Sequence, residues 1–83
     1  MEILLFGITK NIVGASTFTV PASKKSELGI ADVASLKGYL KDTFPGLRDI
    51  SSLAVAVNNQ YASDHTSINE TDEIALIPPV SGG

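Results

Sequence analysis

The sequence ends in Pro78-Pro79-Val80-Ser81-Gly82-Gly83, which places two prolines shortly before two glycines. Proline fixes φ and has no amide hydrogen to donate, so Pro78 and Pro79 end strand pairing and stiffen the chain. Glycine has no side chain, so a channel too narrow for other residues can admit Gly82 and Gly83. An extended tail of this length reaches roughly 20 Å, at about 3.3 Å per residue. The pattern predicts a stiff stalk with a slim tip, whose reactive group is the carboxyl group of Gly83.

A carboxylate is a poor electrophile at neutral pH, but adenylation by ATP converts it into a mixed anhydride with a good leaving group. A persulfide sulfur can then attack the acyl carbon and leave a thiocarboxylate. A lysine amine can instead attack and form an isopeptide bond. The sequence contains no cysteine, so any sulfur that this protein handles cannot sit on a side-chain thiol. We therefore expect Gly83 to be adenylated first and to transfer a group afterwards.

The other residue types that support catalysis do not form a recognised catalytic or metal-binding motif. His65 is the only histidine, so a multi-histidine metal site is excluded and an exposed loop position is expected. Asp64 and several serines surround it, but sequence neighbours do not make a catalytic triad, and no nucleophile elbow is present. The pair Asp72-Glu73 is interpreted as turn residues before a strand. No phosphate-binding loop or dinucleotide fingerprint appears, and we expect no metal and no permanently bound cofactor.

Length and composition limit the kinds of protein that the sequence can encode. Its 83 residues suffice for one domain, which buries only roughly 60% of its unfolded surface and leaves little room for an enclosed active site. Hydrophobic residues make up 43% of the chain, which is typical of a globular protein, and the formal charge of −3 argues against nucleic-acid binding. No apolar run approaches the roughly 18 residues of a membrane span. A cytoplasmic protein without membrane contact is therefore expected.

The pattern of apolar residues predicts several strands and one main helix. Strands are expected at residues 2–8, 16–20, 53–57, 60–62 and 73–77, with 9–15 as a connection that turns at Gly14 and 22–31 as a loop. The first strand is almost continuously apolar, so we expect it to be buried on both faces. Asn58-Asn59 is expected to form a turn, because asparagine tolerates positive φ.

The helix is predicted to begin after Asp32, a favourable N-cap residue, and to end at Pro45-Gly46. Its apolar residues recur at helical spacing, as Val33, Leu36, Leu40 and Phe44.

A hairpin, a helix and further strands in this order predict an α+β fold of the β-grasp (ubiquitin-like) type. The first and last strands would pair at the centre of a mixed sheet, with the helix packed across one face. Residues 1–77 would form the domain and residues 78–83 a flexible tail. Six residues are expected to be buried in the core: Leu5, Val20, Leu36, Leu40, Val57 and Leu76.

Over essentially its whole length, the sequence resembles the small subunits of molybdopterin synthase, the MoaD-type sulfur carriers. The most specific part is residues 72–83, which match the family ending D-E-[VI]-A-x-[FI]-P-P-[VI]-[ST]-G-G. Leu4-Leu5-Phe6-Gly7, residues 33–40 and Ala56-Val57-Asn58 also fit. The sequence departs from the family in two places: Thr71 replaces a usual glycine, and Lys10-Asn11 stands where the family often has Arg-Glu.

The resemblance implies a subunit that donates sulfur without catalysing the reaction itself. An adenylyltransferase related to ubiquitin-activating enzymes would use ATP to adenylate Gly83, and a sulfurtransferase would convert it to the thiocarboxylate. The tail would then enter the large, MoaE-type subunit and donate sulfur to a pterin precursor of the molybdenum cofactor. The complex is expected to be a heterotetramer.

Two alternatives share the activated glycine end. A thiamine-pathway sulfur carrier has the same fold, although such chains are usually shorter and lack the Pro-Pro stalk. A ubiquitin-like protein modifier would form isopeptide bonds with lysines.

Partner contacts are expected around the base of the tail. If Leu76 points into the core, strand alternation directs Ile77 to the opposite face, where Tyr61 is expected to join it. The predicted partner-binding residues are Lys10, Tyr61, Ile77, Pro78, Pro79, Val80, Ser81 and Gly82.

Overall fold

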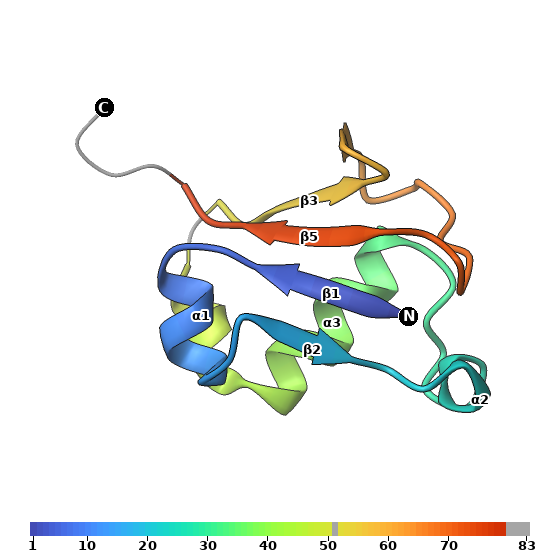
Figure 1. The fold of residues 1–83 in the computed structure, drawn as a ribbon, viewed down its shortest axis with the longest axis horizontal. Coiled ribbons are helices and arrows are strands. Elements are labelled where there is room, and N and C mark those ends of the chain that lie inside the picture. Colours follow the sequence, from blue (N-terminus) through green and yellow to red (C-terminus); the bar gives the residue numbers. More distant parts are fainter. Residues whose placement is uncertain (51, 80–83) are drawn as a thin grey trace.

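Five strands form one mixed sheet in the order β2-β1-β5-β3-β4 (Figure 1). The computed structural model describes residues 1–50 and 52–79. The strands are β1 (Glu2–Leu5), β2 (Thr17–Thr19), β3 (Ala54–Val57), β4 (Gln60–Ala62) and β5 (Ile74–Ile77). The helices are α1 (Ile8–Val13), α2 (Ala22–Lys25), α3 (Val33–Thr43) and the 3₁₀ helix η1 (Pro45–Asp49). Among these residues, no helix is both long and apolar enough to cross a membrane.

The first and last strands lie side by side near the centre of the sheet. β1 and β5 pair in parallel, with Leu5 opposite Leu76, whereas β1–β2, β3–β5 and β3–β4 are antiparallel. Helix α3 crosses behind the sheet in Figure 1. The α+β, ubiquitin-like β-grasp fold expected from the sequence is confirmed, as is the central pairing of the two strands.

Helix α3 begins where the sequence predicted, because Asp32 caps it. The Asp32 carboxylate accepts a hydrogen bond from the backbone nitrogen of Ser35 at 2.8 Å, and the Ser35 hydroxyl accepts one from the backbone nitrogen of Asp32 at 3.0 Å. This reciprocal pair is a capping box, and it satisfies donors that the first helical turn cannot use internally. The apolar side of the helix places Val33, Leu36 and Leu40 in the core with no exposed surface.

Alternate residues of the three inner strands face α3 and form the floor of the core. One row across the sheet contains Leu5, Leu76 and Val55, and all three are buried. The predicted core residues Val20, Leu36 and Leu40 are also buried. The prediction was wrong for Val57, which packs against the core but is only half-buried, because it lies at the end of β3 beside the hairpin turn.

The first strand is shorter than predicted, and a helix follows it. β1 ends at Leu5, and residues 8–13, expected to be part of a strand and a connection, form α1. The sequence of α1 is rich in β-branched residues, so its intrinsic helix propensity is low. Tertiary packing stabilises it, since Ile12 and Val13 contact the core. Gly14, predicted as a turn residue, ends the helix in the left-handed conformation with φ of 85°.

Two further short helices occupy regions expected to be loops. α2 is a single turn within residues 22–31, and η1 follows α3 directly at Pro45. The other strand predictions are correct to within one or two residues at each end. Asn58 and Asn59 form the expected turn between β3 and β4, with φ of 53° and 68°.

Candidate functional site

The face of the sheet opposite α3 carries a row of apolar side chains, of which Tyr61 is exposed, Leu4 and Ala75 are half-buried and Ala56 is buried. The strand register places Leu4 opposite Ala75, Ala75 opposite Ala56, and Ala56 opposite Tyr61. Successive strand residues alternate between faces, so these four point away from the core that holds Leu5 and Leu76. We call this surface the open face, and its apolar residues are Leu4, Phe6, Ala56, Tyr61, Ala75 and Ile77.

The open face contains a shallow hollow of about 290 Å³. Its apolar residues line the hollow together with Asn59 and Glu73. Large apolar side chains remain accessible here, since Tyr61 is 75% exposed and Phe6 is 48% exposed. The structure thus brings Tyr61 and Ile77 to one surface, as the sequence led us to expect. Their role in partner binding stays a prediction.

The open face predicts contact with another protein better than with a small molecule. The hollow is open, and its only described ionisable groups are the Glu73 carboxylate and the Tyr61 phenol. An apolar patch that stays accessible on a folded domain is typical of a protein interaction site. The prediction that β1 is buried on both faces was therefore wrong, because Leu4 is only half-buried on this side.

The tail leaves the sheet at the edge of the open face. Ile77 is the last residue of β5 and lines the hollow, and Pro78 and Pro79 follow it. Pro78 is half-buried and Pro79 is exposed. The predicted site residues Val80, Ser81, Gly82 and Gly83 lie outside the described residues, so the roles assigned to them also stay predictions.

Lys10 lies near the base of the tail but not on the open face. It is an exposed residue of α1, and its backbone nitrogen donates to the carbonyl oxygen of Gly7 at 3.1 Å. Gly7 in turn lies against Pro78. Lys10 does not line the hollow, and its role in partner binding stays a prediction.

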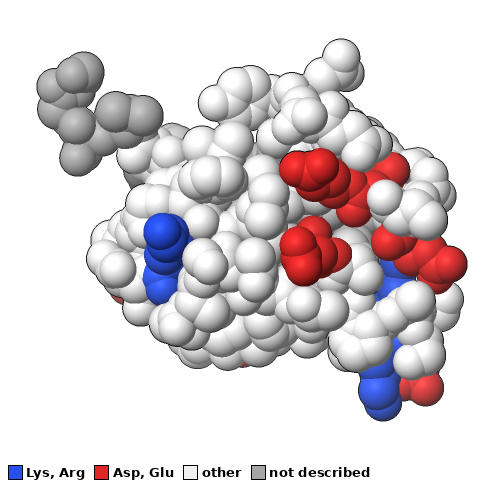
Figure 2. Space-filling model, viewed as in Figure 1, with Lys and Arg blue, Asp and Glu red and all other residues white. Residues whose placement is uncertain are grey.

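Charged side chains are unevenly distributed over the face shown in Figure 2. Most acidic side chains of this face gather at the end away from the tail, where basic side chains also lie, and a further basic group lies over α1. The acidic end surrounds a second hollow, with Glu2, Glu70, Asp72 and Glu73 among its lining residues. Leu4 and Glu73 line both hollows, so the apolar open face continues into acidic surface.

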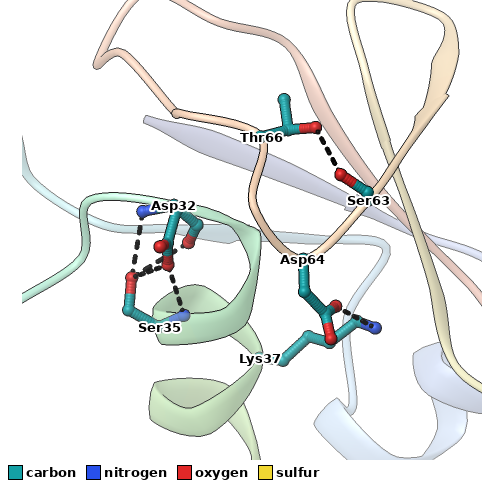
Figure 3. A network of polar contacts seen from close by, with 6 residues as sticks. All are labelled: Asp32, Ser35, Lys37, Ser63, Asp64 and Thr66. Atoms are coloured by element: carbon teal, nitrogen blue, oxygen red, sulfur yellow. Dashed lines mark hydrogen bonds and ion pairs between the residues drawn. The ribbon is translucent and has the colours of Figure 1, made fainter.

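The polar segment of residues 63–66 lies beside the first turns of α3 and is bonded to them (Figure 3). His65 is exposed, as expected, and the Asp64 carboxylate pairs with the Lys37 ammonium at 3.0 Å. The carbonyl oxygens of Asp64 and Thr66 accept hydrogen bonds from the first turn of α3, each at 3.0 Å. Within residues 1–50 and 52–79, no cluster of three carboxylate or histidine side chains could hold a metal ion.

Comparison with known protein families gives a match over almost the whole sequence. Residues 3–83 match the ThiS family. The chain belongs to the ThiS family.

Named relatives of this ThiS family protein are sulfur carrier subunits. It is 30% identical over 86 residues to the molybdopterin synthase sulfur carrier subunit of Arabidopsis thaliana, covering 100% of this chain and 82% of that protein. It is 33% identical over 84 residues to the subunit of the same name from Dictyostelium discoideum, covering 99% and 94%.

Solved structures confirm the fold of this ThiS family protein. Small archaeal modifier protein 1 from Haloferax volcanii superposes with a TM-score of 0.73 at 27% identity, covering 99% of this chain and 97% of that one. One chain in the complex of subunits 1 and 2 of the molybdopterin-converting factor from Helicobacter pylori gives a TM-score of 0.62 at 24% identity. The match covers 99% of this chain and 96% of that one.

Sequence reasoning missed part of the site in this ThiS family protein. Leu4 and Phe6 were assigned to a fully buried strand, and Gly7 was given no role. Strand alternation could have identified the first two, because a buried Leu5 directs both of its neighbours to the opposite face. The contact between Gly7 and Pro78 joins residues far apart in the sequence, so no local pattern predicts it.

Proposed function

We propose that this ThiS family protein is the sulfur carrier subunit of a molybdopterin synthase, and that the Gly83 carboxyl group carries the sulfur as a thiocarboxylate. The observation that carries the proposal is the similarity to two molybdopterin synthase sulfur carrier subunits over nearly the full chain. The geometry supports it, because an apolar docking surface lies at the base of a tail that ends in two glycines.

In the first step, a carboxylate oxygen of Gly83 attacks the α-phosphorus of ATP and displaces pyrophosphate, which leaves an acyl adenylate. In the second, the terminal sulfur of a protein persulfide attacks the acyl carbon and expels AMP, which gives an acyl disulfide. A thiol then attacks the donor's sulfur in that disulfide. This step releases the thiocarboxylate and leaves a new disulfide on the donor side.

This protein contributes position and access to these steps. The prolines restrict φ at positions 78 and 79, so fewer tail conformations compete with the extended one that reaches a partner's active site. The glycines at positions 82 and 83 keep the reactive end slim. The domain itself supplies no acid, base or metal for the chemistry under this proposal.

The open face would hold the partners while the tail reacts. We assign it to two partners that use the tail in turn, an adenylyltransferase of the ubiquitin-activating type and the large subunit of molybdopterin synthase. The Helicobacter pylori structure is a complex of subunits 1 and 2 of a molybdopterin-converting factor, which supports a large-subunit partner of this kind. A heterotetramer in the cytoplasm is the assembly that we propose.

Intact mass spectrometry tests the carrier function directly. The full chain is incubated with ATP, an adenylyltransferase and a persulfide donor, and the mass of the product is measured. The proposal requires a gain equal to the difference between sulfur and oxygen, located at Gly83 by fragmentation. A mass that stays unchanged while the same enzymes modify a known carrier would reject it.

A protein modifier is the second candidate, because small archaeal modifier protein 1 shares the fold at 27% identity. In that case, a lysine amine attacks the acyl adenylate, expels AMP and forms an isopeptide bond. Conjugates of this chain on lysines of other proteins, detected by mass spectrometry of cell extracts, would favour the modifier. A thiamine-pathway carrier would pass the mass test, but its thiocarboxylate would fail to convert a pterin precursor with the large subunit.

A further inference from the structure

The turn between β1 and α1 lies directly beside the base of the tail. β1 and β5 run parallel with Leu5 opposite Leu76, so the segments that follow the two strands leave the sheet at the same end (Figure 1). Gly7 lies two residues after Leu5, and Pro78 lies two residues after Leu76. A Cβ atom added to Gly7 would lie 3.0 Å from Cγ of Pro78, closer than carbon atoms normally approach. The proline ring therefore occupies the space that a side chain at position 7 would need.

The backbone at Gly7 also requires glycine. Its φ is 57° and its ψ is −136°, a region that residues with a side chain rarely adopt. Two separate features of position 7 thus depend on the missing side chain, its backbone conformation and its contact with Pro78.

The turn is anchored by a buried polar residue. The Thr9 side chain is fully buried, and its hydroxyl accepts a hydrogen bond from the backbone nitrogen of Phe6 at 3.0 Å. The same hydroxyl donates to the carbonyl oxygen of Phe6. The backbone nitrogen of Lys10 donates to the carbonyl oxygen of Gly7 at 3.1 Å. These bonds hold the turn in one shape, so Pro78 packs against a fixed surface.

Pro78 connects this surface to the tail. It has no amide hydrogen, so it cannot donate to the β1–β5 ladder, and its ring instead packs against Gly7. The five residues after Pro78 span about 16 Å when extended, at about 3.3 Å each. A small change of direction at Pro78 therefore displaces the far end of the tail by a larger distance.

We infer that Gly7 is a positioning residue for the chemistry at Gly83, because its lack of a side chain seats the Pro78 ring and sets the direction in which the tail leaves the domain. This inference rests on the proposed function for the reaction that it serves. Gly7 lies near the N-terminus, outside the tail and outside the open face, so the inference extends the site beyond both.

The chain offers a matched control for a substitution at Gly7. Gly29 also has positive φ, at 71°, but a Cβ atom there would meet nothing within 4 Å. Gly7→Ala and Gly29→Ala therefore both introduce a strained backbone, and only the first crowds Pro78. A third variant, Pro78→Ala, removes the ring from the other side of the contact without changing a fully buried residue.

The experiment measures pyrophosphate release by the adenylyltransferase as a function of the concentration of each full-length variant. Gly7→Ala should lower kcat by about tenfold or more, because misplacement of a reacting group is costly even when binding is intact. Its KM should stay within about twofold of the wild type, because the open face is unchanged. Gly29→Ala should leave kcat and KM within about twofold of the wild-type values. In the background of Pro78→Ala, Gly7→Ala should cause much less additional loss.

A structural readout tests the inference independently of the activity of each folded variant. Nuclear Overhauser effects between the Gly7 α-protons and the Pro78 ring should be present in the wild type, and residual dipolar couplings of residues 79–82 should differ between Gly7→Ala and Gly29→Ala. Equal kcat values and equal couplings in those two variants would overturn the inference. A wild-type protein that releases no pyrophosphate would instead reject the proposed function, and the couplings would still decide whether Gly7 orients the tail.

Discussion

Asn58 is joined to Asp72 by a hydrogen bond of 3.0 Å from its side-chain nitrogen to a carboxylate oxygen, although the two residues lie in different turns. The side-chain oxygen of Asn58 also accepts from the backbone nitrogen of Glu73 at 3.0 Å, and its backbone nitrogen donates to the Glu73 carbonyl oxygen at 2.8 Å. The β3–β4 turn is thereby tied to the residues that lead into β5. Asn58 thus helps to fix β5, the strand that carries Ile77 and the tail.

Replacing Asn58 should therefore destabilise the fold through two separable contributions, the loss of its side-chain hydrogen bonds and the strain of its left-handed backbone. Asn58→Gly keeps the freedom to adopt positive φ but loses both side-chain hydrogen bonds, which should lower the free energy of unfolding by about 1 kcal/mol. Asn58→Ala adds the cost of a left-handed backbone, about 1 kcal/mol more. Urea unfolding measures both values. Equal stabilities for the two variants would show that the backbone conformation contributes nothing at this position.

The acid stability of the protein should depend on two aspartates. A hydrogen bond from the backbone nitrogen of Asn69, followed by that from Asn58, holds the pKa of Asp72 below its ordinary 3.8. The backbone and then the hydroxyl group of Ser35 lower the pKa of Asp32 in the same way. Because the folded pKa values are the lower ones, this stabilisation is present above the unfolded pKa and is lost as the pH falls through the folded values.

Unfolding by urea between pH 7 and pH 2 measures this dependence. The wild type should lose stability below about pH 4, and Asp72→Asn or Asp32→Asn should each reduce the slope in that range. Asp49→Asn, at an exposed position in η1, serves as the matched control. Identical slopes for the wild type and all three variants would assign acid unfolding to other groups.

The core beneath the open face should be sensitive to loss of volume. Leu40 is fully buried between α3 and the sheet, so Leu40→Ala should lower the free energy of unfolding by about 2–5 kcal/mol. Tyr39, its half-buried neighbour, packs at the edge of the core, and Tyr39→Leu should cost clearly less. The midpoint of chemical denaturation reports both, and an unchanged midpoint for Leu40→Ala would contradict the packing of α3.

Local patterns predicted the elements whose formation depends on nearby residues. The spacing of Val33, Leu36 and Leu40 and the N-cap residue Asp32 predicted helix α3. These signals lie within one or two helical turns of each other. The end of β5 followed from Pro78, which cannot donate to a ladder. These features are determined within a few residues, so the sequence reveals them directly.

Elements stabilised by distant contacts were not predictable in this way. Helix α1 has low intrinsic propensity, and its formation depends on the burial of Thr9 and the packing of Ile12. The half of the site on β1 was missed for a related reason. Alternation places Leu4 and Phe6 on the face opposite Leu5, but an apolar run such as residues 3–6 is compatible with burial on both faces. Only the three-dimensional arrangement reveals that the face with Leu4 and Phe6 is left open.

Deletion of Gly83 should abolish sulfur transfer and leave the domain folded. Residue 83 follows the last strand by six positions, and a chain end beyond the sheet contributes little to stability. The thermal midpoint should stay within about 1 °C of the wild type, since the buried core is unchanged. Loss of both folding and transfer would show that the tail belongs to the domain, and normal transfer would refute the carrier function.

The open face should provide the binding energy for the partners of the tail. Ile77→Asp places a charge on an apolar surface beside the stalk, and Tyr61→Ala removes the most exposed large apolar side chain described. Central apolar residues carry most of the energy of an interface, so Ile77→Asp should weaken binding to the large subunit by about 2 kcal/mol or more. Leu28→Asp is the matched control, because Leu28 is 40% exposed but does not line the hollow. Titration calorimetry measures the affinities, and circular dichroism verifies that each variant is folded. Unchanged affinity for Ile77→Asp and Tyr61→Ala would place the docking surface elsewhere, with the exposed side of α1 around Lys10 as the next surface to test.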